Sequence, residues 1–531
     1  MEWFDNGWGL SLIVFLPIVG ALVTMLIPRA YEAAIKWTAV ITAGATLALA
    51  IVMASRFDYG AASTFQFGTD LQWIEAINAN YHIGVDGISL PLVMLAALVT
   101  LLAVIYSWNH WPEPHNPKLF IVLIMILATG MTGTFVALDL ILFFVFFEVV
   151  LLPMYFMIGI WGDRGIREVP VVGWKMEMRL YASLKFFVFT LSGSAFMLLA
   201  FLALYFRSGD GTPTGVNTFD ILELSALGRN GVFVGTFAFW VFAGLFLGFA
   251  VKVPMWPLHT WLPDAHTAAP TVGSVILAAI LLKLGTYGFV RIAIPILPEE
   301  AQTWAWFIGL LAVIGIIYGS LACLAQSDMK RLIAYSSVGH MGFVMLGIAT
   351  LTPIGINAAI IGMVAHGVIT GLLFFLAGSM SHRYHTRDMG RLGGNQALMP
   401  RMGVLLGFAA MASLGLPALA GFWGEFMALM AAFDPLPGLD TTLFRTFMVI
   451  AAVGTVLTAG YMLWMLRQVN LGEPKAEWEG HTFQDVDTME WLAWAPLVVL
   501  TLAIGIFPNI VFDSTNDAVI DLITTTFGLG G

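Results

Sequence analysis

Four ionisable residues lie inside long apolar segments of this 531-residue chain. Glu148 is separated from Asp139 by eight hydrocarbon residues. That distance in a helix is about 13 Å, which is close to the middle of a bilayer. Lys252, Lys283 and Glu425 repeat the pattern in three other apolar segments. Because a charge at that depth costs on the order of several kcal/mol, the four residues together predict a site that carries ions or protons.

Each of these residues also has a structural interpretation. Glu148 can be a protonated carboxyl group bonded to a neighbouring helix, and Lys252 can extend its side chain to the cytoplasmic interface. Glu425 can bond backbone that a nearby proline leaves exposed. Lys283 is harder to explain in this way, because about 12 Å of helix separates it from Arg291.

Four further residues are weaker candidates. His340 and His366 lie in apolar segments, where one interhelical hydrogen bond often satisfies a histidine. Lys185 lies about five residues inside its predicted span, so interfacial anchoring explains it at least as well as transport. Asp139 is expected at the external boundary. We keep the two histidines as proton-transfer candidates, and Lys185 and Asp139 as possible accessory residues.

Four other histidines, at 259, 266, 382 and 385, and the single cysteine, Cys323, predict no metal or redox site. Tight turns at neighbouring prolines explain the spacing of His259 and His266, and a solvated loop explains His382 and His385. Iron–sulfur, haem and flavin motifs are absent from the sequence. We therefore predict no cofactor in this chain, and any electron chemistry belongs to other chains.

The composition predicts a polytopic membrane protein without a soluble domain. Hydrophobic residues make up 59% of the chain, charged residues 11%, and the mean hydropathy is +0.88. The formal charge of -10 comes without a basic stripe, which argues against nucleic acid as a partner. The first five residues lack the basic region and cleavage site of a signal peptide, so the first apolar run is expected to be a retained helix.

Apolar runs of about 17 to 25 residues predict an all-α membrane protein with about fourteen transmembrane helices. Their predicted starts are Gly9, Ala33, Ile88, Lys118, Leu140, Leu180, Val232, Thr267, Thr303, Leu332, Ile354, Met402, Leu443 and Leu492. Of the 23 Lys and Arg residues, fifteen fall in connections on one side, five on the other and three inside spans. Since cytoplasmic loops carry the excess of positive charge, both termini are expected outside.

Two spans are interrupted by prolines. The apolar run 232–264 is broken by Val-Lys-Val-Pro-Met-Trp-Pro at 251–257, and the run 402–433 by Leu-Gly-Leu-Pro at 414–417. Paired broken helices point to two inverted repeats, here of five helices each, with one broken helix in each. The predicted units are N-terminal helices 1–3 at 1–117, a first repeat (helices 4–8) at 118–295, a second, inverted repeat (helices 9–13) at 303–470, and a loop with helix 14 at 471–531.

Three motifs resemble signatures of the antiporter-like membrane subunits of respiratory complex I. They are FFEVVLLPMY at 146–155, KVPMWPLHTWLPDAH at 252–266 and DMKRLIAYSS at 328–337. The resemblance extends from about Phe120 to Tyr461. Glu425 discriminates within the family, because one subunit type has glutamate in its second broken helix where the sister subunits have lysine.

The resemblance implies that redox energy from a hydrophilic arm drives protons through this chain without electrons passing through it. It implies FMN, iron–sulfur clusters and quinone in partner subunits, and the sister antiporter-like and peripheral-arm subunits as partners. The location would be the bacterial inner membrane, with both termini periplasmic. The implied roles are an ion pair of Glu148 and Lys252, a central Lys283, His340 and His366 on a connecting axis, and Glu425 at the exit.

Two other functions stay open at this point. Membrane subunits of multi-subunit cation/proton antiporters, or of related hydrogenase complexes, share the motifs around Glu148 and Lys252, and the gene neighbourhood would separate them. A purely structural membrane scaffold is the third interpretation. It predicts no effect from charge-neutral substitutions at the buried sites.

Overall fold

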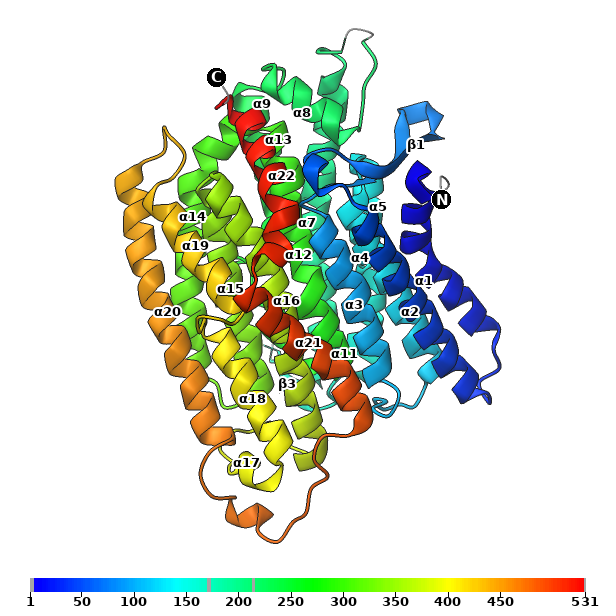
Figure 1. Cartoon of the computed structure of the whole chain (residues 1–531), viewed down its shortest axis with the longest axis vertical. Helices are drawn as coiled ribbons and strands as arrows, with labels where there is room; N and C mark the ends of the chain where they lie inside the picture. The colour runs from blue at the N-terminus through cyan, green and yellow to red at the C-terminus, as the bar shows by residue number, and fades with distance from the viewer. Residues whose placement is uncertain (1–3, 170–172, 213–214, 530–531) are drawn as a thin grey trace.

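The computed structural model describes residues 4–169, 173–212 and 215–529, which form an elongated bundle of helices (Figure 1). The prediction of an all-α membrane protein is confirmed, and within these residues the strands form only two short antiparallel hairpins. One hairpin pairs β1 (Gln66–Ile74) with β2 (Ala79–Val85), and the other pairs β3 (Ile166–Glu168) with β4 (Lys175–Glu177). Helices dominate because hydrocarbon offers the backbone no hydrogen-bond partners.

The helices follow one another along the chain with short connections. The first group is α1 (Gly9–Leu26), α2 (Glu32–Arg56), α3 (Leu90–Tyr106), α4 (Pro117–Val136), α5 (Leu140–Val149), α6 (Leu151–Trp161), α7 (Met178–Ser208), α8 (Ile221–Arg229), α9 (Gly235–Lys252), α10 (Trp261–Ala268), α11 (Thr271–Ile276), α12 (Leu282–Gly288) and α13 (Ile294–Ile296). The second group is α14 (Pro298–Leu324), α15 (Met329–Ala349), α16 (Pro353–Tyr384), α17 (Asn395–Leu398), α18 (Pro400–Ser413), α19 (Gly421–Phe433), α20 (Thr441–Val469), α21 (Thr488–Ile506) and α22 (Asn509–Phe527).

Twelve helices of the described chain are long and apolar enough to cross a membrane by themselves, against about fourteen predicted. The difference has a physical reason. Helix α3 has only 17 residues, and α18 and α19 are halves of 14 and 13 residues on either side of the second break, so each is too short to be counted by itself. The exact number of crossings and the inverted repeats stay predictions.

Both interruptions lie at the prolines that predicted them. Helix α9 ends at Lys252 and α10 begins at Trp261, while α18 ends at Ser413 and α19 begins at Gly421. In the second break Gly415 has a φ of +80°, a left-handed conformation that suits glycine. Each break therefore leaves helix ends inside the bundle, next to a charged residue.

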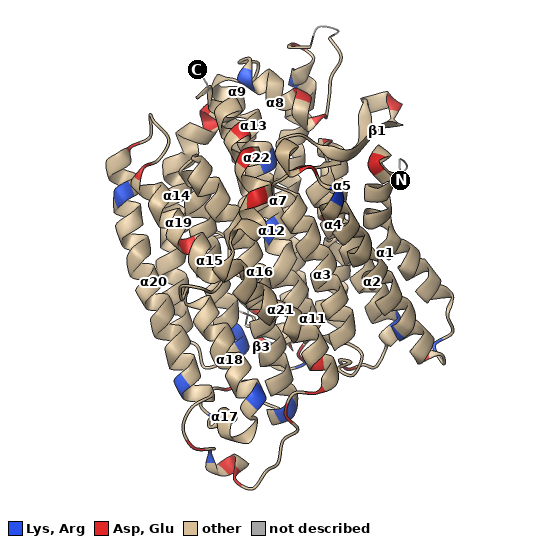
Figure 2. Cartoon of the chain, viewed as in Figure 1, with Lys and Arg blue, Asp and Glu red and all other residues tan. Residues whose placement is uncertain are grey.

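The two ends of the bundle are polar and its middle is apolar. Figure 2 shows the Lys, Arg, Asp and Glu residues concentrated toward both ends. The start of α1 and the end of α22 lie at the same end as β1 (Figure 1). Aspartates begin helices at both ends by accepting backbone N–H groups, as at Asp220, Asp328, Asp440 and Asp487.

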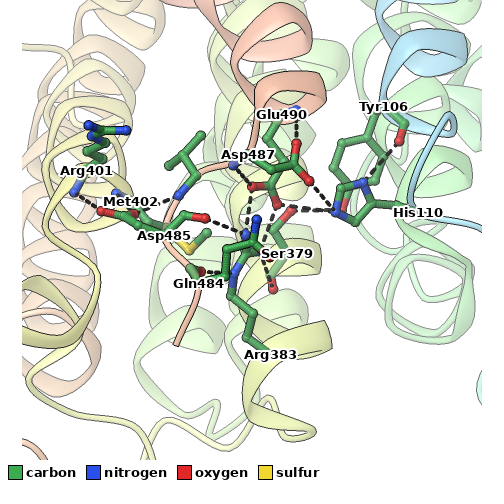
Figure 3. A network of polar contacts seen from close by, with 11 residues as sticks. Tyr106, His110, Ser379, Arg383, Arg401, Met402, Gln484, Asp485, Asp487 and Glu490 are labelled. Atoms are coloured by element: carbon green, nitrogen blue, oxygen red, sulfur yellow. Dashed lines mark hydrogen bonds and ion pairs between the residues drawn. The ribbon is translucent and has the colours of Figure 1, made fainter. Parts of the chain in front are cut away.

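A polar network at the opposite end fixes the start of α21 (Figure 3). Arg383 donates to both carboxylate oxygens of Glu490 at 2.7 Å. His110 Nε2 lies 3.6 Å from Asp487 and 3.5 Å from Glu490, a spacing that three metal ligands would also have. Because the guanidinium already bonds both oxygens of Glu490, the cluster is an ion-pair clamp between the connection after α3, helix α16 and the start of α21.

Candidate functional site

Four ionisable side chains from four helices form a line across the bundle. Lys283 Nζ of α12 lies 2.6 Å from His366 Nδ1 of α16. The rings of His366 and His340 are edge to face, with centroids 5.9 Å apart. His340 Nδ1 of α15 lies 2.9 Å from Glu425 Oε1 of α19. The structure therefore joins the predicted central lysine, both histidines and the predicted exit residue in the expected order.

Lys283 is fully buried, in a stretch of helix with altered hydrogen bonding. The segments 277–281 and 289–293 are π-helical and flank α12. Lys283 Nζ donates to the carbonyl oxygen of Ala278, five residues earlier. A π-helical turn moves backbone bonds from the fourth to the fifth residue and is frequent at functional sites. Within the described chain, the lysine is held by this carbonyl and by His366, with no carboxylate in ion-pair contact.

The second broken helix supplies the surroundings of Glu425. His340 Nε2 lies 3.0 Å from Oγ of Ser413, the last residue of α18. A Cβ at Gly424 would lie 2.6 Å from Cα of Gly362, so the backbones of α19 and α16 touch at this point. Only glycine permits that approach, which holds Glu425 beside His340.

A small cavity of about 30 Å³ lies between these residues, lined in part by His340, His366, Ser413 and Glu425. That volume has room for a water molecule. Nε2 of His366 and Oε2 of Glu425 are buried and have no hydrogen-bond partner among the described residues. The line therefore keeps one free ring nitrogen at His366, inside the line, and one free carboxylate oxygen at Glu425, its end.

Glu148 and Lys252 do not form the direct ion pair that the family resemblance implied. The two residues stay within electrostatic range of each other. The Nζ atom of Lys252 lies 4.5 Å from the ring centroid of Phe147, and no carboxylate of the described chain is in salt-bridge contact with it. The aromatic ring takes the place of the carboxylate, since a cation is attracted to the ring face.

Lys185 is part of an ion cluster at the start of α10. Its Nζ atom donates to Asp264 Oδ2 and to the Thr260 carbonyl oxygen, both at 2.8 Å. Arg167 also bonds Asp264, and Arg331 lies 3.8 Å from it. The sequence allowed two roles for Lys185, interfacial anchoring or proton transport. In the structure its ammonium group is bonded to the carboxylate of Asp264.

Asp139 begins α5 as a capping residue. Its carboxylate accepts the N–H groups of Ile141, Leu142 and Asn80, at 2.8, 3.0 and 3.0 Å. The residue lies at the end of the bundle that carries β2, as expected for a boundary position. Its oxygens are thus used to hold the helix and the hairpin together.

His266 is a residue that sequence reasoning set aside. It is fully buried and stacks on Phe374 with ring centroids 4.4 Å apart, and neither ring nitrogen has a partner in the described chain. Buried Lys330 donates to the carbonyl oxygen of Ala269, three residues further on, at 2.5 Å. Lys330 also lines a cavity of about 290 Å³. The sequence feature that could have identified His266 as a site residue was its position in the same motif as Lys252.

Family comparisons match almost the whole chain. Residues 137–458 match the family described as "NADH:quinone oxidoreductase/Mrp antiporter, TM", and residues 15–134 match "NADH-ubiquinone oxidoreductase chain 4, amino terminus". The chain is 39% identical over 521 residues to NADH-quinone oxidoreductase subunit M of Rhodobacter capsulatus, covering 97% of this chain and 96% of the relative. It is 37% identical to the subunit M of Rickettsia typhi, covering 94% and 95%.

Solved structures give the same grouping. A chain of respiratory complex I from Thermus thermophilus superposes with a TM-score of 0.83 at 28% identity, covering 98% of this chain and 100% of that one. A chain of the Mrp complex from Dietzia sp. has a TM-score of 0.79 at 21% identity, covering 97% and 98%, which shows a shared fold.

Proposed function

The chain belongs to the NADH-quinone oxidoreductase subunit M family, and we infer that it is a proton-translocating subunit in the membrane arm of that complex. It is a multi-pass membrane protein and part of an H⁺-translocating oxidoreductase, whose redox chemistry is expected in other chains. FMN, iron–sulfur clusters and quinone would be bound by partner subunits, among them the peripheral arm. We assign it to the bacterial inner membrane, next to sister antiporter-like subunits, with both termini periplasmic.

We propose that protons pass from Lys283 through His366 and His340 to Glu425. The observation that carries this proposal is the line of four polar side chains, with contacts of 2.6 Å and 2.9 Å at its two ends and the two histidine rings 5.9 Å apart between them. Neutral histidine has one donor and one acceptor nitrogen, so it can take a proton on one side and release it on the other. Water in the small cavity would bridge the two rings.

Glu148 and Lys252 would supply protons to this line, because the charge of each residue affects the protonation of the other. A cation on Lys252 favours the ionised form of Glu148, and the reverse also holds. If the partner charge disappears, Lys252 can release its proton towards Lys283. Because Lys252 lies over the Phe147 ring and makes no salt bridge with Glu148, this coupling would act without direct contact, and a change of side-chain position would regulate it. Single-site titrations would not describe such a coupled pair.

Cytoplasmic access would start from the 290 Å³ cavity at Lys330 and continue through His266. The unpartnered ring nitrogens of His266 support this route. Asp139 and Lys185 would serve it indirectly, by fixing helix ends. The division into 1–117, 118–295, 303–470 and 471–531 remains our proposal, with the two broken helices as its support.

The test compares two variants of Lys283 in the purified, assembled complex. Lys283→Ala removes the titrating group, whereas Lys283→Arg keeps a positive charge that arginine does not release. We expect both variants to lose proton pumping, measured in proteoliposomes with a pH-sensitive dye during NADH oxidation. Full pumping by the arginine variant would leave the residue a fixed electrostatic role and refute the relay. NADH oxidation with an artificial acceptor controls for an intact peripheral arm.

A further inference from the structure

A deep apolar groove runs between α2 and α21, with α3 and α16 as its floor. It has a volume of about 490 Å³. Among its described lining residues only Tyr59 and Ser514 carry a hydroxyl group, and the others are apolar. Its rim reaches the outer surface of the bundle, since the side chains of Ile51 and Val499 are 52% and 61% exposed.

A polar chamber of about 1050 Å³ adjoins this groove. The two spaces share Tyr59 and Ile510 in their linings. Helix α22 follows α21 along the bundle (Figure 1) and turns Asp513 and Asp517, one helical turn apart, into the chamber. Asn357, Asn509 and Asn516 also line it, and none of its described lining residues is Lys or Arg. The chamber is therefore acidic, with amide groups beside the carboxylates.

The order of the two spaces matches the depth profile of a membrane. The apolar groove lies along transmembrane helices, whereas the chamber lies at the end of α2 and at the first turn of α16. The apolar groove thus lies at the depth of the lipid hydrocarbon, and the polar chamber lies at the depth of the membrane interface. A molecule that fills both must have an apolar tail and a polar, cationic head.

We propose that the groove and chamber bind a phospholipid with a primary-amine head group, such as phosphatidylethanolamine. The acyl chain would lie in the groove, and the ammonium group would bond Asp513 and Asp517. The asparagine amides could donate to the phosphate oxygens. Asp513 is exposed and makes no hydrogen bond or ion pair within the described chain, and exposed Asp517 accepts a long 3.4 Å bond from Nδ2 of Asn516, so both carboxylates are available. An anionic head group would be repelled by the same two carboxylates.

The test uses the purified complex in nanodiscs that contain a phospholipid with a photoreactive acyl chain. Three probes carry ethanolamine, choline or glycerol head groups, and mass spectrometry quantifies the label on the peptide around Val499 and Ile510. We expect the ethanolamine probe to label this peptide about fivefold more than the glycerol probe, the ratio for one partly exposed ion pair. Equal labelling by all three head groups would refute the proposal.

Two pairs of variants separate tail from head. Val499→Trp fills the groove and should abolish the label, whereas Val456→Trp, on the 71% exposed outer face of α20, should leave it unchanged. The double variant Asp513→Asn with Asp517→Asn should remove the head-group preference, while Asp434→Asn should keep it. The proposal would be overturned if Val499→Trp left the groove labelling unchanged. It would also be overturned if the groove crosslinked to a neighbouring subunit in place of lipid.

Discussion

Glu425→Gln separates the titration of this residue from its structural contacts. The glutamine side chain has nearly the same shape, and its amide oxygen can still accept the 2.9 Å bond from His340 Nδ1. The contact of His340 with Ser413 at 3.0 Å is untouched. The structural cost should therefore stay below about 1 kcal/mol, and the complex should assemble. The proton that the carboxyl group would pass on is lost, however.

Proton pumping by Glu425→Gln should fall by roughly 100-fold, the order that one positioned proton donor contributes to a rate. The assay is dye-detected acidification of proteoliposomes, with blue native gels to verify assembly and an artificial electron acceptor to verify the peripheral arm. Glu425→Ala is the contrasting variant. It leaves His340 Nδ1 unpartnered in a buried site, so it should also destabilise the subunit by about 1–3 kcal/mol.

Glu425→Lys refines the test, because the sister subunits are expected to use lysine at this position. Any titratable group at the end of the line would sustain part of the activity, so we expect partial pumping. Wild-type pumping by assembled Glu425→Gln or Glu425→Ala complexes would remove Glu425 from the route. The polar line of Lys283, His366 and His340 would then need another end point.

Three further predictions follow from other contacts. Glu148→Gln should assemble but pump poorly, whereas Glu148→Asp should retain partial pumping because it keeps a titratable proton; equal loss in both would argue against a carrier role. Asp264→Asn should destabilise the subunit by about 1–3 kcal/mol and lower the yield of assembled complex on native gels, because Arg167, Lys185 and Arg331 lose their shared anion. Lys185→Ala should destabilise the subunit less, because Asp264 keeps its two arginine partners. Burial lowers the pKa of His82, but its 2.5 Å bond to Asp220 outweighs that and leaves the pKa raised. This pair should thus stabilise the β1–β2 hairpin by about 1 kcal/mol below the ordinary pKa of histidine and lose that contribution as pH rises through the raised value. Hydrogen-exchange protection of the hairpin amides should be higher in wild type than in His82→Gln at low pH, and this difference should shrink as pH rises through the raised pKa of His82. A difference that stays constant with pH would contradict the prediction.

The sequence by itself determined the class of the protein and the positions of its unusual residues. The free energy of placing a charge or a proline in a hydrocarbon segment depends on local composition, so Glu148, Lys252, Lys283 and Glu425 were visible without any structure. For the same reason both helix breaks were predicted at the correct prolines. Composition also predicted the all-α membrane fold, which the helical bundle confirms, whereas the exact number of crossings stays a prediction.

Only the tertiary structure decided which groups touch. The bond between Lys283 and His366 joins residues 83 positions apart, and that between His340 and Glu425 joins residues 85 positions apart. Such contacts depend on how closely helices pack, here on the glycine contact between α16 and α19. Packing also put Phe147 where a direct partner of Lys252 was expected, and gave Lys185 its partner Asp264. A single sequence records the cost of each buried charge, but the partner that offsets the cost is selected by the fold.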